Sequence, residues 1–345
     1  PSRFGVYPPD INERALKEMK KRSNSKYSIS NVNQTSNTFS TYAQEKAIFE
    51  DRGPYNAPGR VRSIIVDSRD NSNKTWIVGG VGGGIYKTND SGVNYEHLSP
   101  ELDNAYITAL VQGEQNPNII YAGAGAAWTY ASAGFSGGSM YKSNDGGNNW
   151  NNISLKDSLG NVHQKFRSIS RMVIDPNDDD ILTIATWAGS SFANDNAAGF
   201  IYRTEDGGNT WNEIYQAGPQ ERITQLVSSP KDSKVIYASV SQVGVLKSTD
   251  GGKSWYNPGN LGLTGSLSYD NPDGLYNVSG SSNFERVEID VSRNNSNLLY
   301  LAATQDWDYV NTTGNRFSKL FVSYDGATTW NLIRNDDGTD DDWLN

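Results

Sequence analysis

One short phrase recurs five times along this chain, and it limits the possible folds more than any other feature. Each copy has a small hydroxylated residue, an aspartate two positions later, two small residues and an aromatic ring at the end. The copies are KTNDSGVNY (87–95), KSNDGGNNW (142–150), RTEDGGNTW (203–211), KSTDGGKSW (247–255) and VSYDGATTW (322–330). Such a repeat indicates an array of equivalent structural units.

Four short segments align around each copy of the phrase, with the alternation of half-buried strands. The first segments are RVRSIIVD (60–67), YITALVQ (106–112), ISRMVID (169–175), RITQLVS (222–228) and RVEIDV (286–291). The second are TWIVG (75–79), IIYAG (119–123), ILTIA (181–185), VIYAS (235–239) and LLYLA (298–302). A third segment leads into the phrase, and a fourth begins at its aromatic residue. This order predicts an all-β fold, a β-propeller of four-stranded antiparallel blades, with five blades visible.

The phrase itself has the chemistry of a tight turn between the third and fourth strands. Its aspartate can accept hydrogen bonds from backbone N–H groups, and its glycines permit positive φ angles. Its tryptophan can bury a large ring between blades. We therefore predict a structural role, rather than a catalytic or metal-binding one, for these residues: Asp90, Asp145, Asp206, Asp250, Asp325, Trp150, Trp211, Trp255 and Trp330.

The phrase resembles the Asp-box, or BNR-type repeat, S/T-x-D-x-G-x-x-W, of sialidase-type, sortilin-type and xyloglucan-cleaving propellers. The resemblance covers residues 60–333, and it is weaker at Ser91 and Tyr95 in the first copy and at Ala327 in the fifth. It implies a ring of more than five blades, so we expect these blades to be part of a seven-bladed or larger assembly. The segment RGPYNAPGRVRSI (52–64) looks like the start of Bacteroidetes surface propellers exported by type IX secretion, which makes secretion machinery an expected partner.

Composition excludes several classes of function. The net charge of −9 argues against nucleic-acid binding, which needs clustered Lys and Arg. The absence of cysteine rules out disulfides and thiolate metal sites. No apolar run approaches the ~20 residues that span a membrane. Because the chain opens at Pro1, we expect that a signal peptide has been removed and that the protein is extracellular or at the outer cell surface.

The N-terminal part differs in composition from the repeats. DINERALKEMKKR (10–22) predicts a short helix, with Asp10 as N-cap, Glu13 as its capping-box partner and a basic last turn. A polar, extended segment follows it. We therefore divide the chain into residues 1–45, an N-terminal helix and polar linker, and residues 46–345, a propeller expected to be incomplete at its C-terminal end.

The long connections are expected on one face of the propeller. Second-to-third connections and fourth-to-first connections emerge on the same side of an antiparallel blade, opposite the recurring turns. The longest of them are residues 124–138, 186–199, 303–318, 154–168 and 257–285. Long loops on a rigid scaffold are where binding usually resides.

Aromatic and basic residues gather on this face. Aromatic rings on loops stack on sugars or anchor a protein partner, unless they fold back into the loops' own cores. Arginines at the starts of first strands, Arg171 among them, can bind carboxylate or sulfate, unless Glu221, Glu285 and Asp175 neutralise them. The candidate ligand-binding residues are Arg60, Arg62, Trp128, Tyr130, Trp187, Arg222, Arg286, Trp307 and Tyr309.

These features predict a non-catalytic propeller that binds a glycan or a surface protein through its long-loop face. The alternative is a glycoside hydrolase, sialidase-like or xyloglucanase-like, which needs two carboxylates about 5–9.5 Å apart. The acid pairs on this face are Asp306 with Asp308 and Asp270 with Asp273. An assembly or chaperone-like propeller, resembling sortilin or photosystem-assembly factors, fits the long loops less well.

Two motifs of the hydrolase families are missing from this chain, which argues against the hydrolase. We also expect no cofactor and no metal. GRVR (59–62) stands where the sialidase family has Arg-Ile-Pro, and GGVGGGIYKTND (79–90) has no acid before Asp90. The two histidines, His97 and His163, lie in no metal or triad motif. The acidic runs 175–180 and 335–343 match no EF-hand spacing, so we interpret them as solvated turns.

Overall fold

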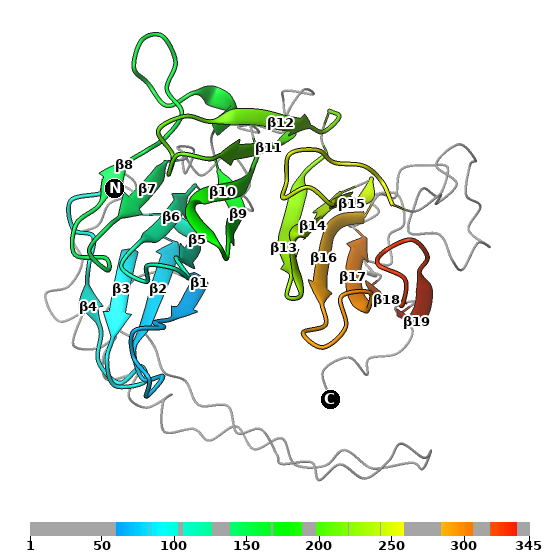
Figure 1. Ribbon diagram of the computed structural model, residues 1–345, viewed down its shortest axis with the longest axis horizontal. Helices are drawn as coiled ribbons and strands as arrows, with labels where there is room; N and C mark the ends of the chain where they lie inside the picture. Colours follow the sequence, from blue (N-terminus) through cyan, green and yellow to red (C-terminus); the bar gives the residue numbers. More distant parts are fainter. Residues whose placement is uncertain are drawn as a thin grey trace, which may run out of the picture.

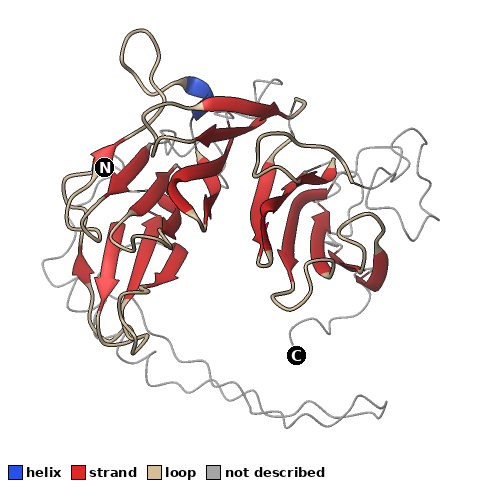
Figure 2. Ribbon diagram, in the orientation of Figure 1, coloured by secondary structure: helices blue, strands red, loops and turns tan. Residues whose placement is uncertain are grey.

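The structure, a computed structural model, describes residues 60–81, 83–102, 106–125, 139–166, 168–187, 198–219, 221–241, 243–258, 284–305 and 318–336. Over these residues the chain is built from strands β1 to β19, apart from the short 3-10 helix η2 (Gln164–Phe166) (Figure 2). The prediction of an all-β fold is confirmed. The predicted N-terminal helix and the boundary at residue 45 lie outside the described residues.

The strands form five antiparallel sheets, each made of strands consecutive in sequence. Blade 1 contains β1 (Arg60–Val66), β2 (Trp76–Val81), β3 (Gly84–Thr88) and β4 (Glu96–His97). Blade 2 contains β5 (Ile107–Gln112), β6 (Ile120–Ala124), β7 (Met140–Ser143) and β8 (Asn151–Asn152). Blade 3 contains β9 (Ile169–Asp175), β10 (Asp178–Trp187), β11 (Gly199–Thr204) and β12 (Asn212–Gln216). Blade 4 contains β13 (Ile223–Ser229), β14 (Asp232–Val240) and β15 (Gly244–Ser248). Blade 5 contains β16 (Phe284–Val291), β17 (Leu299–Gln305), β18 (Ser318–Ser323) and β19 (Asn331–Asp336).

The five sheets stand side by side in an arc, with the first strand of each nearest the middle (Figure 1). First strands of successive blades contact each other, as β1 does β5 and β13 does β16. A separate hydrophobic cluster fills each of the four seams between successive described blades. This arrangement is the β-propeller that the repeat predicts.

Blade 4 differs from the prediction of four strands. Beyond β15, the described residues contain only the bridge between Lys247 and Tyr256, where a fourth strand was expected. Asn257 and Pro258 follow Tyr256 directly, and proline has no N–H group to continue a ladder of hydrogen bonds.

Buried hydroxyl groups join the inner strands of neighbouring blades. The first strand of each of these blades has a β-bulge near its start, which interrupts the pairing with the second strand. The bulged residues are Thr108, Ser170 and Thr224, and each donates to a carbonyl of the next blade's first strand: Ile169 O at 2.5 Å, Ile223 O at 3.0 Å and Val287 O. The bulge thus turns a hydroxyl toward the seam instead of leaving it in the sheet.

The recurring turns have the predicted hydrogen bonds in all five copies. In blade 2, Asp145 Oδ1 accepts from the N–H groups of Asn148 and Asn149, at 3.0 and 2.9 Å. These bonds, with that from the Asn149 side chain, hold the pKa of Asp145 down at about 2. The equivalent carboxylates bind in the same way; they belong to Asp90, Asp206, Asp250 and Asp325. Their structural role is supported by this geometry.

The turn tryptophans pack at the seams. Trp211 is buried against residues of blade 2, and Trp330 against residues of blade 4. Trp150 and Trp255 are half-buried at the edges of their clusters. In two copies a non-glycine residue takes a left-handed conformation, Ser91 at φ 59° and Ala327 at φ 72°. These are the copies in which the sequence departs from the repeat.

Candidate functional site

The candidate site lies at the seam between blades 3 and 4, on the side of the long connections. Trp187 is the last residue of β10 and pairs with Gly199, the first of β11. Arg222 comes directly before β13, and its backbone N–H donates to Ser241 Oγ at 2.7 Å. Ser241 N–H in turn donates to Arg222 O at 2.8 Å, so the arginine backbone is fixed on both sides.

The structure brings two of the predicted binding residues together. The guanidinium carbon of Arg222 lies 4.6 Å from the centre of the Trp187 ring, which is a cation–π contact. Among the residues that the structure describes, no hydrogen bond or ion pair engages this guanidinium. A guanidinium that rests on a ring keeps its planar edge of N–H donors in a fixed orientation. That edge fits a carboxylate, a sulfate or two neighbouring hydroxyl groups.

Trp187 contributes a second polar group to the site. Trp187 is 8% exposed, and its indole Nε1 is buried without a hydrogen-bond partner among the residues that the structure describes. A buried N–H group without an acceptor costs about 1–3 kcal/mol.

The other predicted residues are only partly placed. Arg60 begins β1 and is exposed, and Arg62 follows it half-buried at the β1 bulge. Arg286 pairs through its backbone with Thr304, but its side chain lies outside the described part. Also outside it lie the remaining loop aromatics and the candidate catalytic acids: Trp128, Tyr130, Trp307, Tyr309, Asp270, Asp273, Asp306 and Asp308.

Sequence reasoning missed the partner of Arg171. Its guanidinium lies 3.3 Å from both carboxylate oxygens of Glu288, and its Nε donates to Gln225 Oε1 at 2.6 Å. Two of the predicted acid partners bind elsewhere, since Glu221 accepts from Gly218 N–H and Asp175 from Asn177 N–H. The side chain of the third, Glu285, lies outside the described residues. Aligning the first strands would have found this group, because Arg171, Gln225 and Glu288 all lie opposite equivalent residues of their second strands.

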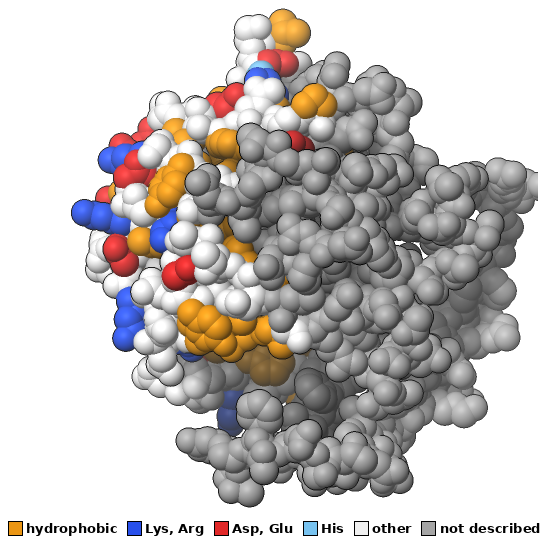
Figure 3. Space-filling view, turned by 90° about the vertical axis from the view of Figure 1, so that its right-hand side faces the viewer, with side chains coloured by type: hydrophobic (Ala, Val, Ile, Leu, Met, Phe, Trp, Pro, Cys, Tyr) orange, Lys and Arg blue, Asp and Glu red, His pale blue; other side chains and the backbone are white. Residues whose placement is uncertain are grey.

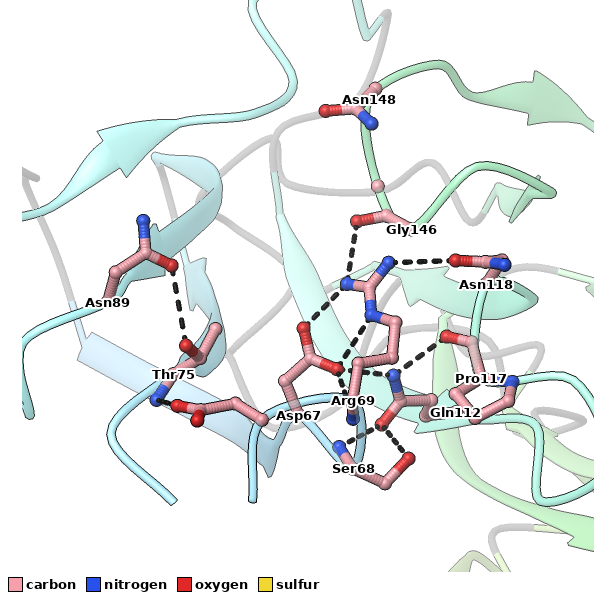
Figure 4. Close-up of polar contacts among 12 residues, drawn as sticks. Asp67, Ser68, Arg69, Thr75, Asn89, Gln112, Pro117, Asn118, Gly146 and Asn148 are labelled. Carbon is pink, nitrogen blue, oxygen red and sulfur yellow. Dashed lines mark hydrogen bonds and ion pairs between the residues drawn. The ribbon is translucent and has the colours of Figure 1, made fainter. Parts of the chain in front are cut away.

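The opposite face carries structural polar contacts between blades. Arg69 of blade 1 donates to both oxygens of Asp67 and to Gly146 O in the turn of blade 2, at 3.2 Å (Figure 4). Burial raises the pKa of Asp67, but the hydrogen bonds from Arg69 and Gln112 outweigh it and lower the pKa overall. The polar groups of this network bind one another within the protein. We therefore interpret it as a structural contact between blades 1 and 2 and not as a binding site.

The described residues show neither a metal site nor a membrane-spanning helix. No group of three or more His, Cys, Asp or Glu side chains in these ranges could hold a metal ion. Within the same ranges, no helix is long and apolar enough to cross a membrane.

Comparison with known proteins shows the fold. No family model and no curated protein matches the sequence. An ancestral GH74 enzyme is similar in structure, with 17% identity and a TM-score of 0.54 over 80% of this chain and 31% of that chain. The GH74 xyloglucanase from Xanthomonas campestris has 13% identity and a TM-score of 0.50, over 81% of this chain and 39% of that chain. YCF48 bound to D1 peptide has 18% identity and a TM-score of 0.41, over 81% of this chain and 83% of that chain. This chain thus spans less than half the length of either GH74 structure.

Proposed function

We propose that this chain is an extracellular or cell-surface propeller of the Asp-box type that binds a glycan without cleaving it. The observation that supports this proposal most directly is the contact between Arg222 and Trp187 on the side of the long loops. A sugar presents hydroxyl and carboxylate oxygens in pairs, which suit the free edge of a guanidinium. The Trp187 ring supports the guanidinium on one side.

Backbone hydrogen bonds fix both Trp187 and Arg222 in place. Trp187 N–H donates to Ser168 O at 3.2 Å, and Arg222 is fixed by Ser241. Binding groups fixed before the ligand arrives lose little conformational freedom on binding, which favours affinity. Surrounding loops on the same face would complete the specificity.

The test is binding to a panel of plant, microbial and host glycans, followed by mass spectrometry of the glycans. We expect retention of one acidic or hydroxyl-rich class with no new reducing ends. Arg222→Gln should weaken retention about tenfold or more, since a charged hydrogen-bonded contact is lost. The matched control is Arg293→Gln, an exposed arginine between β16 and β17 on the opposite face. Equal retention by both variants would remove the site from consideration.

A glycoside hydrolase is the second candidate, favoured by the fold shared with the GH74 enzymes. New reducing ends in the same experiment would establish it. The variants to make would then be Asp306→Asn, Asp308→Asn, Asp270→Asn and Asp273→Asn. Retention of no glycan at all would favour a protein partner instead.

A further inference from the structure

One backbone hydrogen bond recurs at the long-loop end of blades 2, 3 and 4, and it shows which residues of these blades are equivalent. It joins the end of the second strand to the residue just before the first strand. Its copies are Gly125 N–H to Tyr106 O, Trp187 N–H to Ser168 O and Ser241 N–H to Arg222 O. Trp187 is therefore equivalent to Gly125, and Arg222 is equivalent to Ser168.

Small residues close the seam between blades 2 and 3 at this place. A Cβ atom on Gly125 would lie 2.5 Å from Ser168 Cα, so a side chain there would clash with the backbone of blade 3. Between blades 3 and 4 a tryptophan and an arginine take the same two places, with the guanidinium carbon of Arg222 4.6 Å from the centre of the Trp187 ring. Because the backbone bond forms in both cases, the fold itself does not require these two large side chains.

Arg222 also differs from two other arginines in its charge environment. Arg171 is half-buried, and its guanidinium lies 3.3 Å from the carboxylate of Glu288. Arg203 is buried and forms an ion pair with Glu205. Arg222 is half-buried as well, yet no carboxylate of the described ranges pairs with it. A partly buried charge without a counter-ion has lost hydration that nothing replaces.

The acid next to Arg222 in the sequence is bound elsewhere. The carboxylate of Glu221 accepts from Gly218 N–H at 2.6 Å, and Glu221 N–H donates to Gly218 O at 3.2 Å, so both groups belong to one turn. Burial, and after it the charge of Glu221, raise the pKa of Tyr215 in β12. Glu221 is thus engaged within its own turn and beside Tyr215, and it forms no ion pair with Arg222.

We propose that the glycan bound at Arg222 and Trp187 carries an anionic group, a carboxylate or a sulfate, whose oxygens bind the Arg222 guanidinium and act as its counter-ion. This inference rests on the proposed glycan-binding function. Two oxygens of either group match the fork of N–H donors that an arginine presents. The Trp187 ring holds one face of the guanidinium and leaves those donors at its edge.

The charge of the rest of the protein makes such a preference specific to a local site. The chain has a net charge of −9, which repels polyanions in general. In the view of Figure 3, acidic and basic side chains are interspersed over the described surface. Tight binding of an anionic glycan would therefore have to come from a particular cation and not from a broad basic surface.

The test compares polymers that differ in charge alone, with binding measured by isothermal titration calorimetry. Polygalacturonate is compared with its carboxyl-reduced form, and dextran sulfate with dextran. We expect at least one charged polymer to bind about tenfold or more tightly than its neutral form, and the pair that shows the difference identifies the group as carboxylate or sulfate. Arg222→Gln should abolish the difference by weakening the charged polymer alone. Arg222→Lys keeps the charge without the fork and should retain part of the difference.

The control is Arg293→Gln, which removes an exposed positive charge on the opposite face and should bind like wild type. Thermal unfolding of each variant shows that it is folded. Charged and neutral polymers that bind equally well, with no effect of Arg222→Gln, would overturn the anionic ligand and leave glycan binding in place. A preference lost equally in Arg293→Gln would overturn it too, because general charge would then be responsible. Binding of no polymer, charged or neutral, would overturn both this inference and the proposed function.

Discussion

Arg171 of blade 3 and Glu288 of blade 5 form an ion pair at 3.3 Å, although the first strand of blade 4 comes between their strands in sequence. Gln225 of that strand accepts from Arg171 Nε at 2.6 Å. One guanidinium therefore joins three successive inner strands.

Loss of this ion pair should lower the free energy of unfolding. Arg171→Met removes the donor that Gln225 and Glu288 share, so we expect a cost of about 1–3 kcal/mol. Glu288→Gln keeps a hydrogen-bond acceptor and should cost less, about 1 kcal/mol. Urea denaturation of both variants and of the double variant gives the coupling energy between the two residues.

The control for that cycle is the exposed pair of Lys165 and Glu213, also 3.3 Å apart. Exposed ion pairs contribute about 0–1 kcal/mol. A coupling energy for Arg171 and Glu288 no larger than that of the control pair would show that the contact does not tie the inner strands together.

The sequence predicts the blades because their signals are local. A turn aspartate bonds to groups three and four residues away, as Asp145 does with Asn148 and Asn149, so its pattern can be read from a few letters. The ion pair of Arg171 and Glu288 joins residues 117 positions apart. It depends on how two sheets are placed around a common centre, which alternation within one strand does not specify.

At the candidate site, too, the sequence predicted the individual residues but not the contact between them. Trp187 and Arg222 were both predicted as binding residues, one as a loop aromatic and one as an inner-strand arginine. Their contact at 4.6 Å was not predicted, because it joins the end of β10 to the start of β13 across a seam. In blade 4 the prediction of a fourth strand was wrong although a local signal was present. Pro258, two residues after Tyr256, argues against a strand there, but the prediction followed the repeat instead.

The seam hydroxyls provide a second prediction. Thr108→Val keeps the shape of the side chain but removes the donor to Ile169 O, so we expect a loss of about 1–3 kcal/mol in unfolding free energy. Thr224→Val should cost less, because Ser239 Oγ also donates to Val287 O, at 2.6 Å. The exposed Thr249→Val is the control for the substitution itself. Equal, small effects in all three proteins would mean that the hydroxyls do not stabilise the seams.

The turn tryptophans should differ in their contributions to stability. Trp211 is buried, donates from Nε1 to Ile153 O of blade 2 at 2.9 Å and lies edge-on to Phe166. Trp211→Ala should therefore cost about 3–5 kcal/mol. Trp150 is half-buried and donates to Gly147 O within its own turn, so Trp150→Ala should cost less. Thermal unfolding of the two variants ranks them, and the reverse order would contradict the seam role of Trp211.

The turn aspartates should make the protein lose stability in acid. Hydrogen bonds from the turn hold the pKa values of Asp90, Asp145 and Asp206 at about 2, below the ordinary aspartate value of 3.8. A carboxyl group with a lowered folded-state pKa contributes stability above its unfolded pKa, and that stability is lost as the pH falls through the folded pKa. The melting temperature should thus fall between about pH 4 and pH 2. Asp145→Asn should already be less stable at neutral pH and should lose less on acidification, whereas the exposed Glu101→Gln should follow wild type. An unchanged acid dependence in Asp145→Asn would show that the turn carboxylates do not set it.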